Sequence, residues 1–138
     1  MLRGLSAMVW IRISRIRRKY EHGASEELRG WNLSLALFDL LTTLSVSEGM
    51  TQSELARQLI VTQGNITQLL DKLEQRGLLL RRQEGRRKCL MLTERGRELL
   101  KTVVPAHALW NEKQFAGLST EEQRELLRLL RKLDHALE

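Results

Sequence analysis

The chain contains a single cysteine and a single proline among its 138 residues. One cysteine excludes an intramolecular disulfide, which is typical of proteins in a reducing compartment, so we expect a cytoplasmic location. No apolar run approaches the roughly 20 residues that a membrane-spanning helix needs, and we therefore predict no membrane segment. Because proline is scarce and leucine is frequent, we expect a mostly helical chain.

Groups that build catalytic or metal centres are also scarce. The three histidines, His22, His107 and His135, are far apart in the sequence. We find no spacing typical of metal ligands, no glycine-rich phosphate loop and no nucleophilic triad motif. The sequence therefore predicts neither an enzyme nor a bound cofactor or metal.

The charge balance is basic. Lysine and arginine number 23 against 17 acidic residues, which gives a net charge of +6. A balance of this kind favours a polyanionic partner, with nucleic acid as the first candidate and an anionic membrane surface as its rival. The hydrophobic content of 42% is that of an ordinary folded protein, and the length fits a single domain, residues 1–138.

The middle of the chain predicts two short helices separated by a turn. Thr51 and Glu54 form a capping box, which marks the start of the first helix. Thr62 is a good N-cap type and opens a second helix over residues 62–76, which Gly77 ends. One face of that second helix is apolar at helical spacing, through Ile66, Leu69, Leu70 and Leu73.

The opposite face of this second helix is polar, and a basic hairpin follows it. Its amide and hydroxyl side chains are Gln63, Asn65, Thr67 and Gln68. Amides donate and accept hydrogen bonds together, as base edges in the major groove require. We expect a strand from Leu78, a turn at residues 83–85 and a return strand at residues 89–92. The basic residues of this hairpin are Arg81, Arg82, Arg86, Arg87 and Lys88. This order of elements is typical of a winged helix-turn-helix.

The segments on either side predict further helices. Residues 1–20 carry a helical apolar stripe and many arginines, and we interpret them as a first helix rather than a transit peptide or a secretory signal. Residues 22–25 are expected to form a loop, and Ser34 to cap a helix that runs to about Val46. The buried ridge of that helix is expected at Leu37, Leu40, Leu41 and Leu44. Thr93 should cap a long helix that Pro105 kinks or breaks, and Ser119 with Glu122 should open a last helix.

Short motifs in this chain resemble the multiple antibiotic resistance regulator (MarR) family. They are Thr-Gln-Ser-Glu-Leu-Ala at residues 51–56, Gly-Leu-Leu at 77–79, Glu-Gly-Arg at 84–86 and Leu-Thr-Glu-Arg-Gly at 92–96. The resemblance implies a mainly α fold with a small β-wing. Residues 33–93 would form the DNA-binding lobe, and residues 1–30 and 94–138 the dimerisation helices.

The same resemblance implies a function. Members of this family are homodimeric bacterial transcription factors that bind a pseudo-palindromic operator, and many release double-stranded DNA on binding a small phenolic or lipophilic effector. A repressor of this kind is the function that we expect. The leucine-rich stripe of the last helix, at Leu126, Leu127, Leu130, Leu133 and Leu137, is also wide enough to suggest a second subunit.

We can assign residues to this function. The expected base readers are Gln63, Asn65 and Gln68. The expected phosphate contacts are Ser53, Thr62, Thr67 and Lys72, and the expected wing contacts are Arg86 and Arg87. An effector pocket, if it follows the family, would be lined by the aromatic and histidine side chains Trp10, Trp31, Phe38, His107 and Trp110. For each of these five residues taken singly, a core or interface position is the alternative that we favour.

Three alternatives remain open at this stage. The polar helix face could meet a protein rather than DNA, as in a winged-helix interaction module. The basic segment around Arg12 and Lys19 could bind an anionic membrane surface. Cys89, with Arg87 and Lys88 nearby, could serve as a redox sensor, although a lone cysteine in a strand is more often a small buried hydrophobe.

Overall fold

A computed structural model describes residues 4–59 and 66–138 of the chain. These residues pack as two compact units, residues 1–107 and 108–138, and each is described here by itself. The structure is mostly helical with one small antiparallel sheet, which confirms the predicted fold class. Among the described residues, no helix combines the length and the apolarity that crossing a membrane requires.

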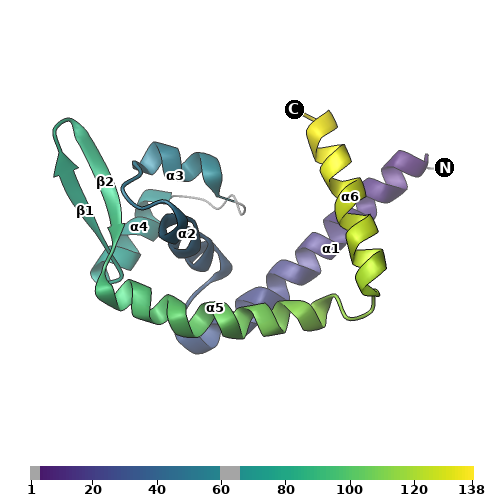
Figure 1. Cartoon of the computed structure of the whole chain (residues 1–138), viewed down its shortest axis with the longest axis horizontal. Helices are drawn as coiled ribbons and strands as arrows, with labels where there is room; N and C mark the ends of the chain where they lie inside the picture. Colours follow the sequence, from purple (N-terminus) through teal and green to yellow (C-terminus); the bar gives the residue numbers. More distant parts are fainter. Residues whose placement is uncertain (1–3, 60–65) are drawn as a thin grey trace. The chain divides into compact units, whose positions relative to one another are not determined.

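The first unit holds the winged helix-turn-helix (Figure 1). In chain order its elements are α1 (Leu5–Leu28), the 3-10 helix η1 (Arg29–Trp31), α2 (Leu35–Val46), α3 (Gln52–Gln58), α4 (Ile66–Gln75), β1 (Leu79–Glu84), β2 (Arg87–Leu92) and the first part of α5 (Glu94–Gln114). The helix α2 is central, because α1, α3, α4 and β2 all contact it. The two strands form a hairpin that extends beyond the helices.

The core of this unit is built almost entirely from leucines. Ser34 caps α2 as predicted, its hydroxyl accepting from the Leu37 N–H at 3.1 Å. The predicted ridge of α2 is buried together with leucines of the neighbouring elements, namely Leu37, Leu40, Leu41, Leu44, Leu55, Leu70, Leu73, Leu79 and Leu90. Burying each such side chain contributes roughly 1.5–3 kcal/mol to the free energy of folding. The leucines packed around the central helix α2 therefore stabilise the unit.

The first helix is longer than the sequence indicated. We expected a loop at residues 22–25, but α1 continues without a break to Leu28. Ala24 and Leu28 are fully buried in the core, and this burial outweighs the roughly 1 kcal/mol that Gly23 costs inside a helix. The chain then reverses through η1 and Asn32, whose φ of 56° is left-handed. The predicted loop was wrong because tertiary packing extends the helix.

Local signals at the helix ends of the helix-turn-helix are confirmed. The Glu54 N–H donates to Thr51 Oγ1 at 3.2 Å, and the Thr51 N–H donates to Glu54 Oε2 at 3.1 Å. Gly77 has a φ of 73° and ends α4 in a Schellman motif. In that motif the Leu78 N–H donates to the carbonyl of Leu73 at 3.0 Å. Thr62, the predicted cap of α4, lies outside the described residues.

The hairpin turn is tighter than expected. The strands pair as far as Glu84 and Arg87, so the turn consists of Gly85 and Arg86 alone, not of residues 83–85. Gly85 has a φ of 62°, and glycine at the first position of a two-residue turn permits a positive φ without strain. The return strand therefore starts at Arg87 rather than at Cys89.

The base of the hairpin is fastened to the body of the unit. Leu90 of β2 exchanges backbone hydrogen bonds with the segment before α3, because Gly49 N–H donates to its carbonyl and its own N–H donates to Met50, both at 2.9 Å. Thr93 caps α5 as predicted, its hydroxyl accepting from the Gly96 N–H at 3.0 Å. A Cβ at Gly96 would lie 2.2 Å from the Leu78 carbonyl oxygen, so α5 starts very close to β1.

The second unit consists of the end of α5 and of α6 (Thr120–Ala136). We expected Pro105 to kink or break this helix, and α5 runs through Pro105 without a break. Pro105 is exposed, so water can satisfy the helix carbonyl that proline leaves without a donor. Ser119 and Glu122 form the predicted capping box of α6. Large apolar side chains of α6 and of the residue that caps its C-terminus are exposed in the single chain: Leu126, Leu127, Leu129, Leu130, Leu133 and the capping Leu137.

Candidate nucleic-acid interface

The helix α4 has one buried and one exposed side. Leu70 and Leu73 are fully buried, whereas Thr67, Gln68 and Lys72 are exposed. Three of the proposed DNA contacts, Thr62, Gln63 and Asn65, lie outside the described residues. The described part of α4 therefore presents polar and cationic groups outward, as a recognition helix requires.

The start of α3 lies against the start of α4. The Gln52 amide Nε2 donates to Thr67 Oγ1 at 2.7 Å and so connects the two helices. Ser53, a proposed phosphate contact, is exposed beside Gln52 at the start of α3. The sequence analysis did not single out Gln52, and only its position directly after the capping residue Thr51 could have suggested its role.

The basic residues of the hairpin fall into two groups. Arg81 is half-buried and donates to Asp71 at 2.9 Å and to Glu74 at 2.8 Å, which joins β1 to α4. Arg87 is paired with Glu54 of α3. The other three cations, Arg82, Arg86 and Lys88, are exposed and form no ion pair with any described residue. Arg86 occupies the turn at the tip.

The carboxylates of Glu54 and Glu48 connect the hairpin to the segment at and before α3 through charged hydrogen bonds. The pKa of Glu54 is lowered by the hydrogen bond from the Thr51 N–H and by the Arg87 guanidinium. Glu48 accepts from the Leu92 N–H at 2.9 Å and from Arg97 Nη2 at 2.8 and 2.9 Å. Partial burial raises the pKa of Glu48, but the hydrogen bonds from Arg97 and Leu92 lower it by more. Both carboxylates are therefore charged at neutral pH.

Cys89 lies on the buried side of β2 and is only 2% exposed. Its sulfur lies 3.8 Å from Glu84 Oε2, across the hairpin. A redox-sensing thiol must be exposed for an oxidant to reach it. The burial of Cys89 therefore favours a packing role over the redox alternative.

A cavity of about 440 Å³ lies between α1 and α2 and reaches the first part of α5. Two of the predicted pocket residues, Phe38 and His107, line it with their ring centroids 4.7 Å apart. The buried His107 Nδ1 is 2.8 Å from Glu27 Oε2. Burial, followed by the charge of Glu27, raises the pKa of Tyr20, which also lines the cavity.

The three tryptophans of the predicted pocket do not line this cavity. Trp10 is 67% exposed on α1, Trp31 packs against the leucine core from η1, and Trp110 belongs to the second unit. The lining residues that the sequence analysis missed include Arg17, Tyr20 and Asp39. Arg17, Tyr20 and Glu21 follow one another at helical spacing and so share one face of α1, but the predicted helix ended at residue 20, and its face was not related to the pocket.

Comparisons with known proteins agree with this geometry. The model of the MarR family matches residues 33–86. A helix-turn-helix-type transcriptional regulator from Bacillus cereus is 32% identical over 123 residues, which cover 89% of this chain and 84% of the relative. The transcriptional repressor MprA from Escherichia coli is 36% identical over 116 residues, covering 77% of this chain and 63% of MprA.

A solved structure has the same fold. BpsR from Bordetella bronchiseptica, whose DNA binding is regulated by 6-hydroxynicotinic acid, superimposes with a TM-score of 0.83 at 22% identity. The match covers 96% of this chain and 98% of that chain.

Proposed function

This chain belongs to the MarR family of winged-helix DNA-binding transcription regulators, and from that premise we propose that it is a homodimeric cytoplasmic repressor of a pseudo-palindromic operator. The observation that carries the proposal is the exposed polar side of α4, which lies beside the start of α3 and next to a hairpin whose cations Arg82, Arg86 and Lys88 form no ion pair with any described residue. That combination is suited to a groove with phosphates on both sides.

In this proposal α4 enters the major groove of each half-site. Gln68 reads a base edge together with Gln63 and Asn65, because an amide pairs well with adenine. Ser53, Thr62, Thr67 and Lys72 contact the flanking phosphates and fix the register without reading sequence. The exposure of Thr67, Gln68 and Lys72 supports these roles.

The wing would approach the adjacent minor groove or its phosphates through Arg86 and Arg87. Arg86 is exposed at the tip and free of ion pairs with the described residues, so we assign it the larger electrostatic contribution. Arg87 is partly neutralised by Glu54 and can contribute fully only when that pair opens.

The dimer would be formed by the terminal helices. The exposed leucines of α6 and the exposed Leu5, Val9 and Ile16 of α1 support this, because a large apolar area left in water marks an interaction surface. A twofold dimer would place its recognition helices roughly 34–36 Å apart, one turn of DNA. An enzyme function has no support in this family assignment.

Regulation by a small aromatic effector is the last part of the proposal. BpsR responds to an aromatic acid, and MprA is a repressor. The Phe38–His107 cavity supports the same scheme here, because it offers an aromatic wall beside buried polar groups. A ligand there would release DNA only by preferring the arrangement that does not bind DNA.

The proposal is tested by selecting binding sites from random duplex DNA and sizing the complex in solution. We expect an enriched inverted repeat bound by a dimer. Salt-sensitive bulk binding without enrichment would contradict sequence-specific regulation, and a monomer on a single half-site would contradict the dimer.

A further inference from the structure

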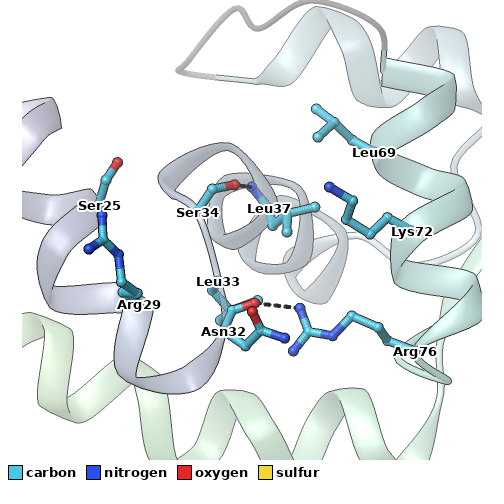
Figure 2. A pocket seen from close by; sticks show the side chains of 9 residues that line it. All are labelled: Ser25, Arg29, Asn32, Leu33, Ser34, Leu37, Leu69, Lys72 and Arg76. Atoms are coloured by element: carbon cyan, nitrogen blue, oxygen red, sulfur yellow. Dashed lines mark hydrogen bonds between the residues drawn. The ribbon is translucent and has the colours of Figure 1, made fainter.

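The guanidinium of Arg76, just after the end of α4, connects that helix to the joint between α1 and α2 (Figure 2). Its Nη1 donates to the Asn32 carbonyl at 2.6 Å and its Nη2 to the Trp31 carbonyl at 3.3 Å. These acceptors lie 44 and 45 residues earlier in the chain. Arg76 forms no ion pair with any described residue, so no carboxylate among them competes for its guanidinium.

The two acceptors belong to a helix end. The 3-10 helix η1 follows α1 directly, and the chain leaves it at Asn32, whose φ of 56° is left-handed. The Leu33 N–H closes this turn by donating to the Leu28 carbonyl at 3.2 Å. The carbonyls of Trp31 and Asn32, further along, accept from Arg76 instead. Because the C-terminal end of a helix carries partial negative charge, a cation is favourable there.

The other side of the connection is also a fixed helix end. The Arg76 N–H donates to the Lys72 carbonyl at 3.1 Å, so its backbone still belongs to the last turn of α4. Gly77, with its φ of 73°, reverses the chain directly afterwards. A guanidinium is planar and carries its donors in a rigid fork, so two hydrogen bonds from it define an angle as well as a distance. Arg76 therefore holds two helix ends in one relative orientation.

The space beside this connection is not filled by side chains. A cavity of about 500 Å³ lies between the end of α1, the start of α2 and α4, and Arg29, Leu33, Lys72 and Arg76 are among the residues that line it (Figure 2). Atoms that face a cavity lack packing partners on that side. The hydrogen bonds of Arg76 therefore carry a larger share of the connection between α4 and the α1 end than they would in a close-packed interior.

We propose that Arg76 is a positioning residue for DNA recognition, which sets the angle between α4 and α1 and thereby the spacing of half-sites that the dimer accepts. The inference rests on the proposed function, in which α1 helps to join the subunits and α4 reads each half-site. In a twofold dimer any tilt of α4 against α1 occurs in both subunits, so it changes the separation of the two recognition helices twice over.

A change of spacing by one base pair makes a large demand on this angle. It moves the half-sites by about 3.4 Å along the duplex and by about a tenth of a turn around it. The two α4 helices can follow such a shift only by leaving the orientation that Arg76 holds. The unmodified chain should therefore discriminate against the altered spacing, and loss of the Arg76 hydrogen bonds should relax that discrimination.

The test measures spacing rather than affinity alone. The inverted repeat selected by the unmodified chain, and versions with one base pair added or removed between the half-sites, are titrated with the full chain by fluorescence anisotropy. The readout is the Kd for an altered repeat divided by the Kd for the selected repeat. Arg76→Met keeps an unbranched side chain but removes the donors. We expect it to lower this ratio by about tenfold, since hydrogen bonds from a charged group are lost, and to keep the base preference within each half-site.

The matched control is Arg29→Met. Arg29 lines the same cavity and is exposed, but it pairs with Glu26 of its own helix end rather than with α4, and its substitution removes the same charge. Its ratio should equal that of the unmodified chain. Arg76→Lys keeps the charge without the planar fork, so it should lower the ratio while leaving the salt dependence of binding unchanged. It also replaces Arg76→Met as the test variant if thermal unfolding shows that Arg76→Met does not fold.

Two results would overturn the inference. They are a ratio in the Arg76 variants equal to that of the unmodified chain, and a loss of affinity by the same factor at every spacing, which is what simple destabilisation produces. If the unmodified chain selects no inverted repeat, the proposed function fails and takes this inference with it. If a repeat is selected and its spacing is read equally strictly without Arg76, the inference fails alone.

Discussion

The Arg87 guanidinium on β2 donates to both carboxylate oxygens of Glu54 on α3, at 2.9 and 3.1 Å. Glu54 also closes the capping box of α3. One carboxylate thus starts the helix-turn-helix and neutralises a cation of the wing. A second ion pair of this kind joins Glu48, in the loop before α3, to Arg97 on α5.

The first prediction separates the two roles of Glu54. In Glu54→Gln the amide keeps the capping hydrogen bonds, because glutamine also serves at this position, but Arg87 is released. We expect tighter binding to random duplex DNA. The slope of the logarithm of the binding constant against the logarithm of the salt concentration should be steeper by about 0.9 per freed phosphate contact. Fluorescence anisotropy over a salt series measures both. Glu98→Gln, which frees the exposed Lys101 on α5, should leave the slope unchanged; an equal change in both variants would refute the role of Arg87.

A second prediction concerns acid. The pKa values of Glu48 and Glu54 are both lowered below the usual value of 4.5. Each carboxylate therefore contributes stability that is fully present above pH 4.5 and is lost as the pH falls through its folded-state pKa. Thermal unfolding followed below this pH should show a steep fall of Tm. Glu48→Gln should have a shallower fall, and an identical profile would show that the Arg97 pair is not responsible.

A third prediction concerns the close approach of α5 to β1. In Gly96→Ala the new Cβ would meet the Leu78 carbonyl oxygen at 2.2 Å, so backbone must move. We expect a loss of about 1–3 kcal/mol in the free energy of unfolding. Gly117→Ala is the matched control, because a Cβ there meets nothing within 4 Å. Denaturant unfolding checks both variants, and equal midpoints would mean that this contact relaxes freely.

The fourth prediction concerns the tip of the wing. Arg86→Ala removes an exposed cation that forms no ion pair with the described residues, so stability should not change. DNA affinity should fall for all sequences alike, and the salt dependence should flatten by about 0.9. The same anisotropy series measures this. Unaltered affinity and slope would show that the tip does not reach the duplex.

Signals within a few residues of one another could be read from the sequence. The capping boxes at Thr51 and Ser119 and the glycine end of α4 were all confirmed, because each depends on atoms three to five residues apart. The leucine periodicity of α2 likewise predicted its buried ridge.

Relationships between distant residues could not be read in this way. The helical path through residues 22–25 depends on the burial of Ala24 and Leu28 against other elements. The basic hairpin looked uniform in sequence, yet Arg81 binds two acids of α4. Glu27 and His107 are 80 residues apart, and nothing local connects them.

The most direct measurement is to repeat the binding-site selection with Gln68→Ala beside the unmodified chain. Gln68 is exposed on α4, so the substitution should leave the fold intact and change the preferred base at one position of each half-site. The account predicts that change, symmetric about the dyad, with the other positions retained. Identical selected sites for the two proteins would contradict the claim that this side of α4 reads the DNA sequence.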